Sequence, residues 1–143
     1  MQKYTDKASI PLKFHAFYRY VLLPLNFAFL LYSFLQEIKE MTFFHWTFVV
    51  IVISYIIIIT SLVIIFIGFY TWRPYGWYAI YVSLIASLAY NCFAAFILIA
   101  YDSAQAAYSA GVIFGSLLRL GLIGLYYAKR KVLFFPNEVE IID

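Results

Sequence analysis

The sequence predicts an all-α integral membrane protein in which four transmembrane helices form an up-down bundle. Hydrophobic residues make up 66% of the 143-residue chain and charged residues 12%, against about 45–50% and about 25% in a soluble domain. The mean hydropathy is +0.89. Four stretches each supply the ~20 apolar residues that a membrane-spanning helix needs. These observations exclude a soluble domain, a disordered chain and a disulfide scaffold.

The four spans are expected at residues 17–36, 43–70, 76–101 and 106–128 of a single bundle, with a cytoplasmic tail at 129–143. The block 49–59 is apolar on every face, which favours a helix over the alternating pattern of a barrel strand. Pro24 frees a backbone carbonyl in the first span and is expected to kink it. The apolar region after Arg19 is too long for a cleaved signal peptide, so the first span is expected to be permanent.

The short connections at residues 37–42, 71–75 and 102–105 require neighbouring helices to run antiparallel. Lys and Arg near the span ends then predict the orientation, because cytoplasmic loops carry an excess of both. One side holds eight of them, namely Lys3, Lys7, Lys13, Arg19, Arg73, Lys129, Arg130 and Lys131. The other side holds Lys39. Both termini of this multi-pass protein are therefore predicted to lie in the cytoplasm, and the basic residues serve orientation rather than nucleic-acid binding.

Arg119 is a charged residue expected near mid-membrane, because it lies ten residues, ~15 Å along a helix, before Lys129. A charge there costs at least ~2.5–3 kcal/mol and marks a candidate functional site. No Asp or Glu lies within the predicted spans, so its polar neighbours are expected to come from Asn26, Asn91, Ser116 and the tyrosine hydroxyls. Either the side chain reaches the cytoplasmic face, or it binds an anion from outside the chain: a lipid phosphate, a small ligand or a partner's carboxylate.

Gly111 and Gly115 form a GxxxG motif in the fourth span, and Arg119 continues the same row four residues later. This motif lets two helix backbones approach closely. Two roles stay open, namely packing inside the bundle and an interface with another chain. Packing inside the bundle is the commoner of the two, and the coincidence of the motif with Arg119 adds support to the interface.

A polar stripe follows the third span, where Ser83, Ser87 and Asn91 share one face at a spacing of four residues. Such a stripe either joins helices through hydrogen bonds or lines a narrow aqueous path, and joining is the commoner use. Asn26 lies two residues after Pro24, where a kink would widen a cavity. Tyr55 and Tyr90, deeper in their spans, are expected to need hydrogen-bond partners inside the bundle.

The aromatic residues near the span ends are expected to anchor the protein at the membrane interface. They are Trp46, Trp72, Trp77, Tyr70, Tyr75, Tyr78, Tyr101, Tyr126 and Tyr127. His15 and His45 are expected to be solvated on opposite sides of the membrane, so they cannot share a metal ion. The apolar patch at residues 133–135 is expected to lie against the membrane surface, with the acidic end of the tail solvated.

Catalytic motifs are missing from the sequence. The single cysteine, Cys92, permits neither an internal disulfide nor a Cys-based zinc site. No Ser-His-Asp set, carboxylate pair, metal-binding motif or phosphate-binding glycine loop occurs. We therefore expect no cofactor and no metal, and an enzyme is the less favoured class.

Three stretches, PLKF to YRYVLLPL at residues 11–25, YGWY at 75–78 and the run to YYAKRKVLF at 122–134, carry a resemblance that covers most of the chain. Together they resemble a loose group of uncharacterised small four-helix membrane proteins of Gram-positive bacteria. Some members look like a zinc ribbon fused to such a bundle, and this chain lacks the ribbon. The resemblance implies a bacterial plasma-membrane protein and brings no activity with it.

Three functions remain. The first is an accessory or assembly subunit that docks a partner helix, a lipid or a second copy through a face formed by Gly111, Gly115 and Arg119. The alternative is a transporter or oligomeric pore for a small or anionic solute, with Arg119, Asn91 and Asn26 along the path. An aqueous cavity that reaches Arg119 would favour this alternative. The third is a membrane lipid-processing enzyme. The expected partners are the bilayer, another membrane protein or a second copy, and anionic lipid.

Overall fold

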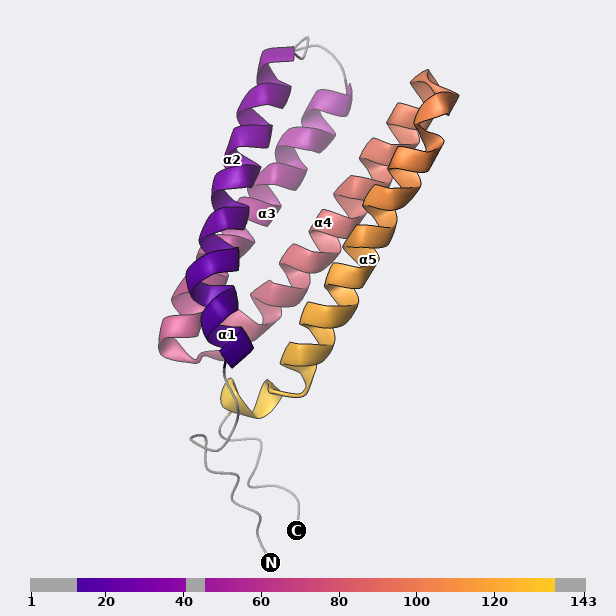
Figure 1. Ribbon diagram of the computed structural model, residues 1–143. Coiled ribbons are helices and arrows are strands. Elements are labelled where there is room, and N and C mark those ends of the chain that lie inside the picture. The colour runs from indigo at the N-terminus through magenta and orange to yellow at the C-terminus, as the bar shows by residue number, and fades with distance from the viewer. Residues whose placement is uncertain (1–12, 41–45, 136–143) are drawn as a thin grey trace, which may run out of the picture.

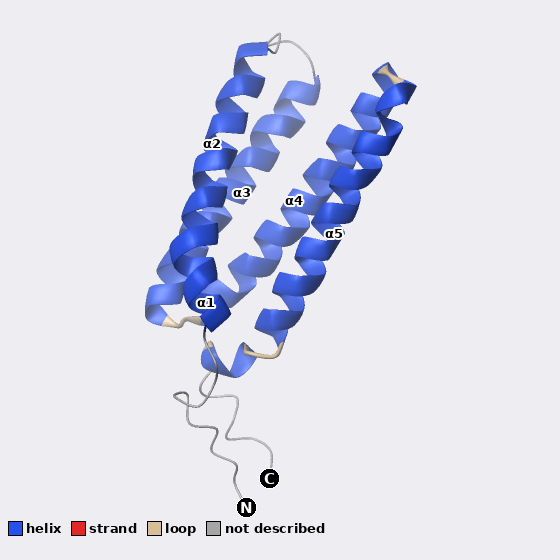
Figure 2. Cartoon of the chain, viewed as in Figure 1, coloured by secondary structure: helices blue, strands red, loops and turns tan. Residues whose placement is uncertain are grey.

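Four long helices with short connections make up the described part of this computed structural model, residues 13–40 and 46–135. Figures 1 and 2 show the helices running up and down in sequence order. Each of the four is long and apolar enough to cross a membrane, and they span Lys13–Lys39, Trp46–Thr71, Pro74–Tyr101 and Ser103–Ala128. The prediction of an all-α chain with four such helices is confirmed.

The first long helix contains a π-helical turn just before Pro24. It consists of α1 (Lys13–Phe17), the turn Tyr18–Leu22 and α2 (Leu23–Glu40). The first N–H of α2 donates to the carbonyl of Tyr18, five residues earlier rather than four. Because proline has no N–H and its ring crowds the preceding turn, the wider π turn accommodates it within a continuous helix. The distortion expected at Pro24 takes this form.

α3 (Trp46–Thr71) and α4 (Pro74–Tyr101) meet at a tight turn in which Trp72 adopts the left-handed conformation, with φ 49°. Beside this turn, Gly68 and Gly76 bring the two backbones into contact. A Cβ atom added to either glycine would overlap the Cα atom of the other. The close helix approach in this bundle therefore depends on Gly68 and Gly76, a pair that the sequence analysis did not single out.

α5 (Ala106–Ala128) packs along α4 and is held to it by hydrogen bonds to its backbone. The Tyr81 hydroxyl donates to the Gly124 carbonyl at 2.8 Å, and the Trp77 indole N–H donates to the Tyr127 carbonyl at 3.1 Å. Short 3-10 turns flank this helix at Ser103–Gln105 and Lys131–Leu133.

Six ring side chains close the end of the bundle at which the described chain begins and ends. This aromatic cluster consists of His15, Tyr18, Phe69, Trp72, Tyr127 and Phe134. The His15 ring lies 4.6 Å from the Phe69 ring and 4.7 Å from the Trp72 ring, centroid to centroid. Of the aromatic residues expected to anchor the protein at the membrane interface, Tyr127 instead lies in the core, 1% exposed, and Trp72 is partly buried against it.

Two expectations about this end are wrong. The patch at residues 133–135 does not lie against a surface, because the turn after α5 folds it inward and leaves Phe134 0% exposed. His15 is not solvated either. It is 5% exposed, and its Nδ1 lies 3.1 Å from the Tyr127 hydroxyl, since the surrounding rings exclude water. The acidic end of the tail, His45, Lys3 and Lys7 lie outside the described residues.

The helices diverge away from the aromatic cluster (Figure 1). α4 packs closely on both α3 and α5, whereas α2 rests mainly on α3. The basic residues at Lys13, Arg73 and 129–131 stand at helix ends beside the cluster, so they share one end of the bundle. Toward the opposite end, the rings of Trp46 and Phe93 join α3 to α4, with centroids 5.8 Å apart.

Candidate functional site: a polar cavity among four helices

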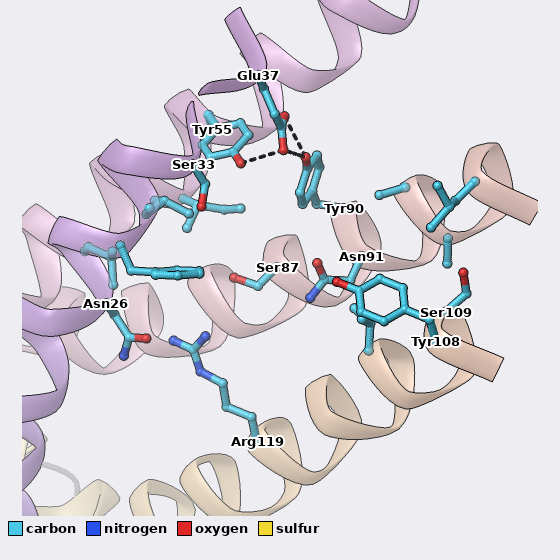
Figure 3. A pocket seen from close by; sticks show the side chains of 18 residues that line it. Asn26, Ser33, Glu37, Tyr55, Ser87, Tyr90, Asn91, Tyr108, Ser109 and Arg119 are labelled. Atoms are coloured by element: carbon cyan, nitrogen blue, oxygen red, sulfur yellow. Dashed lines mark hydrogen bonds between the residues drawn. The ribbon is translucent and has the colours of Figure 1, made fainter. Parts of the chain in front are cut away.

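A cavity of about 460 Å³ lies among α2, α3, α4 and α5. Figure 3 shows the side chains that line it. Its walls mix apolar residues with polar groups, the usual composition of a ligand site. The polar and charged lining residues are Asn26, Ser33, Glu37, Tyr55, Ser87, Tyr90, Asn91, Tyr108, Ser109 and Arg119. The structure thus brings together three of the five candidate residues from the sequence: Arg119, Asn91 and Asn26.

Arg119 reaches into the cavity from α5 and points toward Asn26 on α2 (Figure 3). The guanidinium interacts with the hydroxyl of Tyr18, which belongs to the aromatic cluster and is 1% exposed. Arg119 therefore lies at the closed end of the cavity, where the cluster begins. Its side chain is only partly buried, so its N–H groups remain accessible from the cavity.

Glu37 lies toward the other end of the cavity, where two tyrosines hold its carboxylate (Figure 3). The Tyr55 hydroxyl donates to Oε1 at 3.0 Å. The Tyr90 hydroxyl lies 2.7 Å from Oε1 and 2.8 Å from Oε2. The two tyrosine rings pack edge to face, with centroids 5.2 Å apart. The prediction that Tyr55 and Tyr90 find partners inside the bundle is confirmed, and the partner is a carboxylate.

Serine and asparagine side chains lie between these two charges. Asn91 donates to the Ser116 hydroxyl at 2.7 Å, which joins α4 to α5 beside the cavity. Ser33 and Ser87 face the cavity from α2 and α4 (Figure 3). Ser109 is 1% exposed, and within the described residues its hydroxyl has no hydrogen-bond partner. Asn91 thus joins α4 to α5 and also lines the cavity.

The other two candidate residues, Gly111 and Gly115, do not line the cavity. Both are exposed, and a Cβ atom added to either would meet nothing within 4 Å among the described residues. Packing inside the bundle, one of the two roles left open for this motif, is therefore wrong for the described chain. Arg119 lines the cavity, whereas both glycines are exposed. Each four-residue step along a helix advances about 40° beyond a full turn, so Gly115 lies about 40° and Gly111 about 80° around the helix from Arg119.

Glu37 was not predicted as a site residue, because residues 37–42 were expected to form the connection between the first two spans. The first span was expected to end at residue 36, which left no acidic residue within a span, whereas α2 continues to Glu40. Two signals were available in the sequence. Residues 36–40 are mostly good helix formers. Asn26, Ser33 and Glu37 are also spaced by seven and four residues, which places them on one helix face.

The cavity can therefore hold a polar molecule between groups of opposite charge. A guanidinium offers N–H donors in a fork that matches carboxylate or phosphate oxygens. The Glu37 carboxylate offers an acceptor and a negative charge. Within residues 13–40 and 46–135, no three His, Cys, Asp or Glu side chains gather as a metal site would require.

Comparison of the chain with protein-family models, with curated proteins and with solved structures found no match.

Proposed function

We propose that this is a bacterial plasma-membrane protein that binds a small polar solute in the four-helix cavity and carries it across the bilayer. The observation that carries the proposal is the polar cavity of about 460 Å³ that reaches Arg119. This is the feature by which the sequence analysis distinguished a transporter from a docking subunit.

The energetics of a charge inside a membrane support the proposal. Ionisable side chains within membrane helices are expensive, and they typically face a water-filled cavity on a substrate pathway. Arg119, Glu37 and Asn91 all face the same cavity. Much of the outer surface of the bundle carries exposed apolar side chains, as a lipid-facing surface should. The chain therefore gathers its intramembrane polar groups on the inside, where a solute would pass.

The shape of the cavity supports a carrier in a conformation that is open to one side of the membrane. The aromatic cluster seals the end that holds the basic residues, which the excess of Lys and Arg predicts to be cytoplasmic. Toward the other end, the lining includes the exposed side chains of Tyr108 and Leu98. In this proposal the structure is the outward-facing state, and transport requires the aromatic cluster to separate.

Thiol accessibility tests the proposal directly, because the chain has a single cysteine that can be removed. In a Cys92→Ser background, Ser87→Cys places a thiol in the cavity, and Ile85→Cys places one on the exposed outer face of the same helix. A membrane-impermeant thiol reagent should label Ser87→Cys in intact cells and also in inside-out vesicles. It should label Ile85→Cys in neither, since lipid covers that site.

Labelling of Ser87→Cys from one side only would support an aqueous binding cavity but would contradict transport. Equal labelling of both variants, or labelling of neither, would contradict the aqueous cavity itself.

Docking of a partner helix or a second copy remains a second candidate, favoured by the unobstructed Gly111 and Gly115 backbone. Replacing both glycines with Ile should dissociate a complex that is observed by native mass spectrometry in mild detergent. Ala110→Ile, an equally bulky change at the neighbouring exposed position, should leave the complex intact. A complex that survives the double replacement would eliminate this candidate.

A further inference from the structure

We propose that the solute is a free short peptide of about three residues, whose carboxylate binds Arg119 and whose terminal ammonium group binds Glu37. The inference rests on the proposed function, since it takes the same cavity as the binding site. It deepens that function by naming the class of solute.

The two charged groups have capacity for a ligand. A guanidinium carries five N–H donors, and the interaction of Arg119 with the Tyr18 hydroxyl uses only part of that capacity. Among the described residues, the carboxylate of Glu37 is held by the hydroxyls of Tyr55 and Tyr90 and by no cationic side chain. Its negative charge is therefore not neutralised within the described residues.

The spacing of the two charges excludes a free α-amino acid as a ligand that bridges them. Arg119 points toward Asn26 (Figure 3), and Glu37 follows Asn26 by eleven residues on one helix. Eleven residues correspond to about 16 Å along the helix axis. An extended peptide covers at most ~3.3–3.6 Å per residue, so three residues span about 10–11 Å. The side chains of Arg119 and Glu37, which both reach into the cavity, cover the rest of the separation.

The middle of the cavity suits a peptide backbone better than a hydrocarbon chain. Ser33 and Ser87 face this region (Figure 3). Their hydroxyls can form hydrogen bonds with a peptide N–H or C=O, which a hydrocarbon chain cannot do. Leu30, Ile58 and Leu62 line the remaining wall and accept small apolar side chains.

Calorimetric titration of the full-length protein in lipid nanodiscs tests this inference with four probes of one chemical series. The probes are tri-L-alanine, its N-acetyl derivative, its C-terminal amide, and L-alanine. Tri-L-alanine should bind, and each blocked peptide should bind at least tenfold more weakly, because it loses one of the two charge contacts. L-alanine should also bind at least tenfold more weakly, because it reaches only one charge. This comparison uses the unaltered protein, so it does not depend on the folding of any variant.

Two substitutions test which terminus of the peptide binds Arg119 and which binds Glu37. In Arg119→Leu, tri-L-alanine and its amide should bind equally weakly. In Glu37→Gln, tri-L-alanine and its N-acetyl derivative should bind equally weakly. Arg73→Leu removes an exposed arginine outside the cavity and should leave all affinities unchanged.

Blocked peptides that bind as tightly as tri-L-alanine would overturn the inference, as would the absence of tri-L-alanine binding. In either case, two-sided labelling of Ser87→Cys would still support a carrier for another solute. Peptide binding together with one-sided labelling would instead contradict transport and support a short peptide as the ligand.

Discussion

Glu37 gives the cavity its acidic group. It lies near the end of α2, yet its carboxylate turns inward because two tyrosine hydroxyls, from α3 and α4, converge on it. Hydrogen bonds to a charged group are stronger than those between neutral groups. Three helices are thus joined at one carboxylate, on the side of the cavity opposite to Arg119.

Removal of one hydroxyl from this group should weaken the fold. Tyr90→Phe keeps the ring and loses the two short contacts to Glu37, so the free energy of unfolding should fall by about 1 kcal/mol. Tyr32→Phe removes a hydroxyl from an exposed tyrosine of α2 and should change it by less than about 0.3 kcal/mol. Reversible unfolding in mixed detergent micelles measures both. Equal effects of the two substitutions would mean that the carboxylate does not join the helices.

At the scale of elements, small residues have two different uses in this chain. Gly68 and Gly76 let α3 and α4 touch backbone to backbone beside their turn. Gly111 and Gly115 form the recognisable motif, yet within the described residues their surface is open. A GxxxG spacing therefore identifies a flat helix surface, and the fold determines whether the same chain covers it.

One added methyl group distinguishes these two uses. Gly68→Ala should lower the free energy of unfolding by about 1–3 kcal/mol, because the new Cβ atom meets the backbone of Gly76, which cannot move aside as a side chain would. Gly111→Ala should leave it unchanged or raise it by up to about 1 kcal/mol, since alanine favours the helix and meets nothing. Thermal unfolding of the two purified variants provides the comparison. A larger loss of stability for Gly111→Ala than for Gly68→Ala would contradict the packing described.

At the scale of the whole molecule, the bundle has one closed end and one open end. The aromatic cluster joins α1, the turn after it, α3, the α3–α4 turn, α5 and the segment that follows α5, so segments far apart in the sequence meet there. Phe134 completes this cluster from beyond the last long helix. The largest buried rings thus gather at one end, and the hydrogen bonds of Glu37 join α2, α3 and α4 beside the cavity.

Removal of Phe134 should therefore affect the whole bundle. Phe134→Ala deletes a fully buried ring, and the free energy of unfolding should fall by about 3–5 kcal/mol. Leu125→Ala shortens a well-exposed side chain of α5 and should cost far less. Both values come from the unfolding assay used for Tyr90→Phe. A small loss for Phe134→Ala would show that the segment after α5 does not close the bundle.

The one-dimensional pattern of the chain was sufficient for some features and insufficient for others. The four long apolar helices and the segregation of Lys and Arg follow from local composition, because backbone hydrogen bonding and the length of an apolar run are properties of each segment alone. The position of Arg119 inside an apolar span was also visible, since a charge in such a run stands out. Glu37 lies at the end of the first apolar span beside other charged residues, so its charge did not stand out in the sequence.

By itself, then, the sequence determined that this chain forms four helices able to cross a membrane, with its basic residues gathered at one end. Tertiary structure alone decided that Glu37, Asn91 and Arg119 line one cavity, that His15 and Phe134 are buried, and that Gly111 and Gly115 are left uncovered. The physical reason is that helix formation is a local property, whereas the rotation of each helix and the meeting of distant side chains depend on how all the helices pack at once.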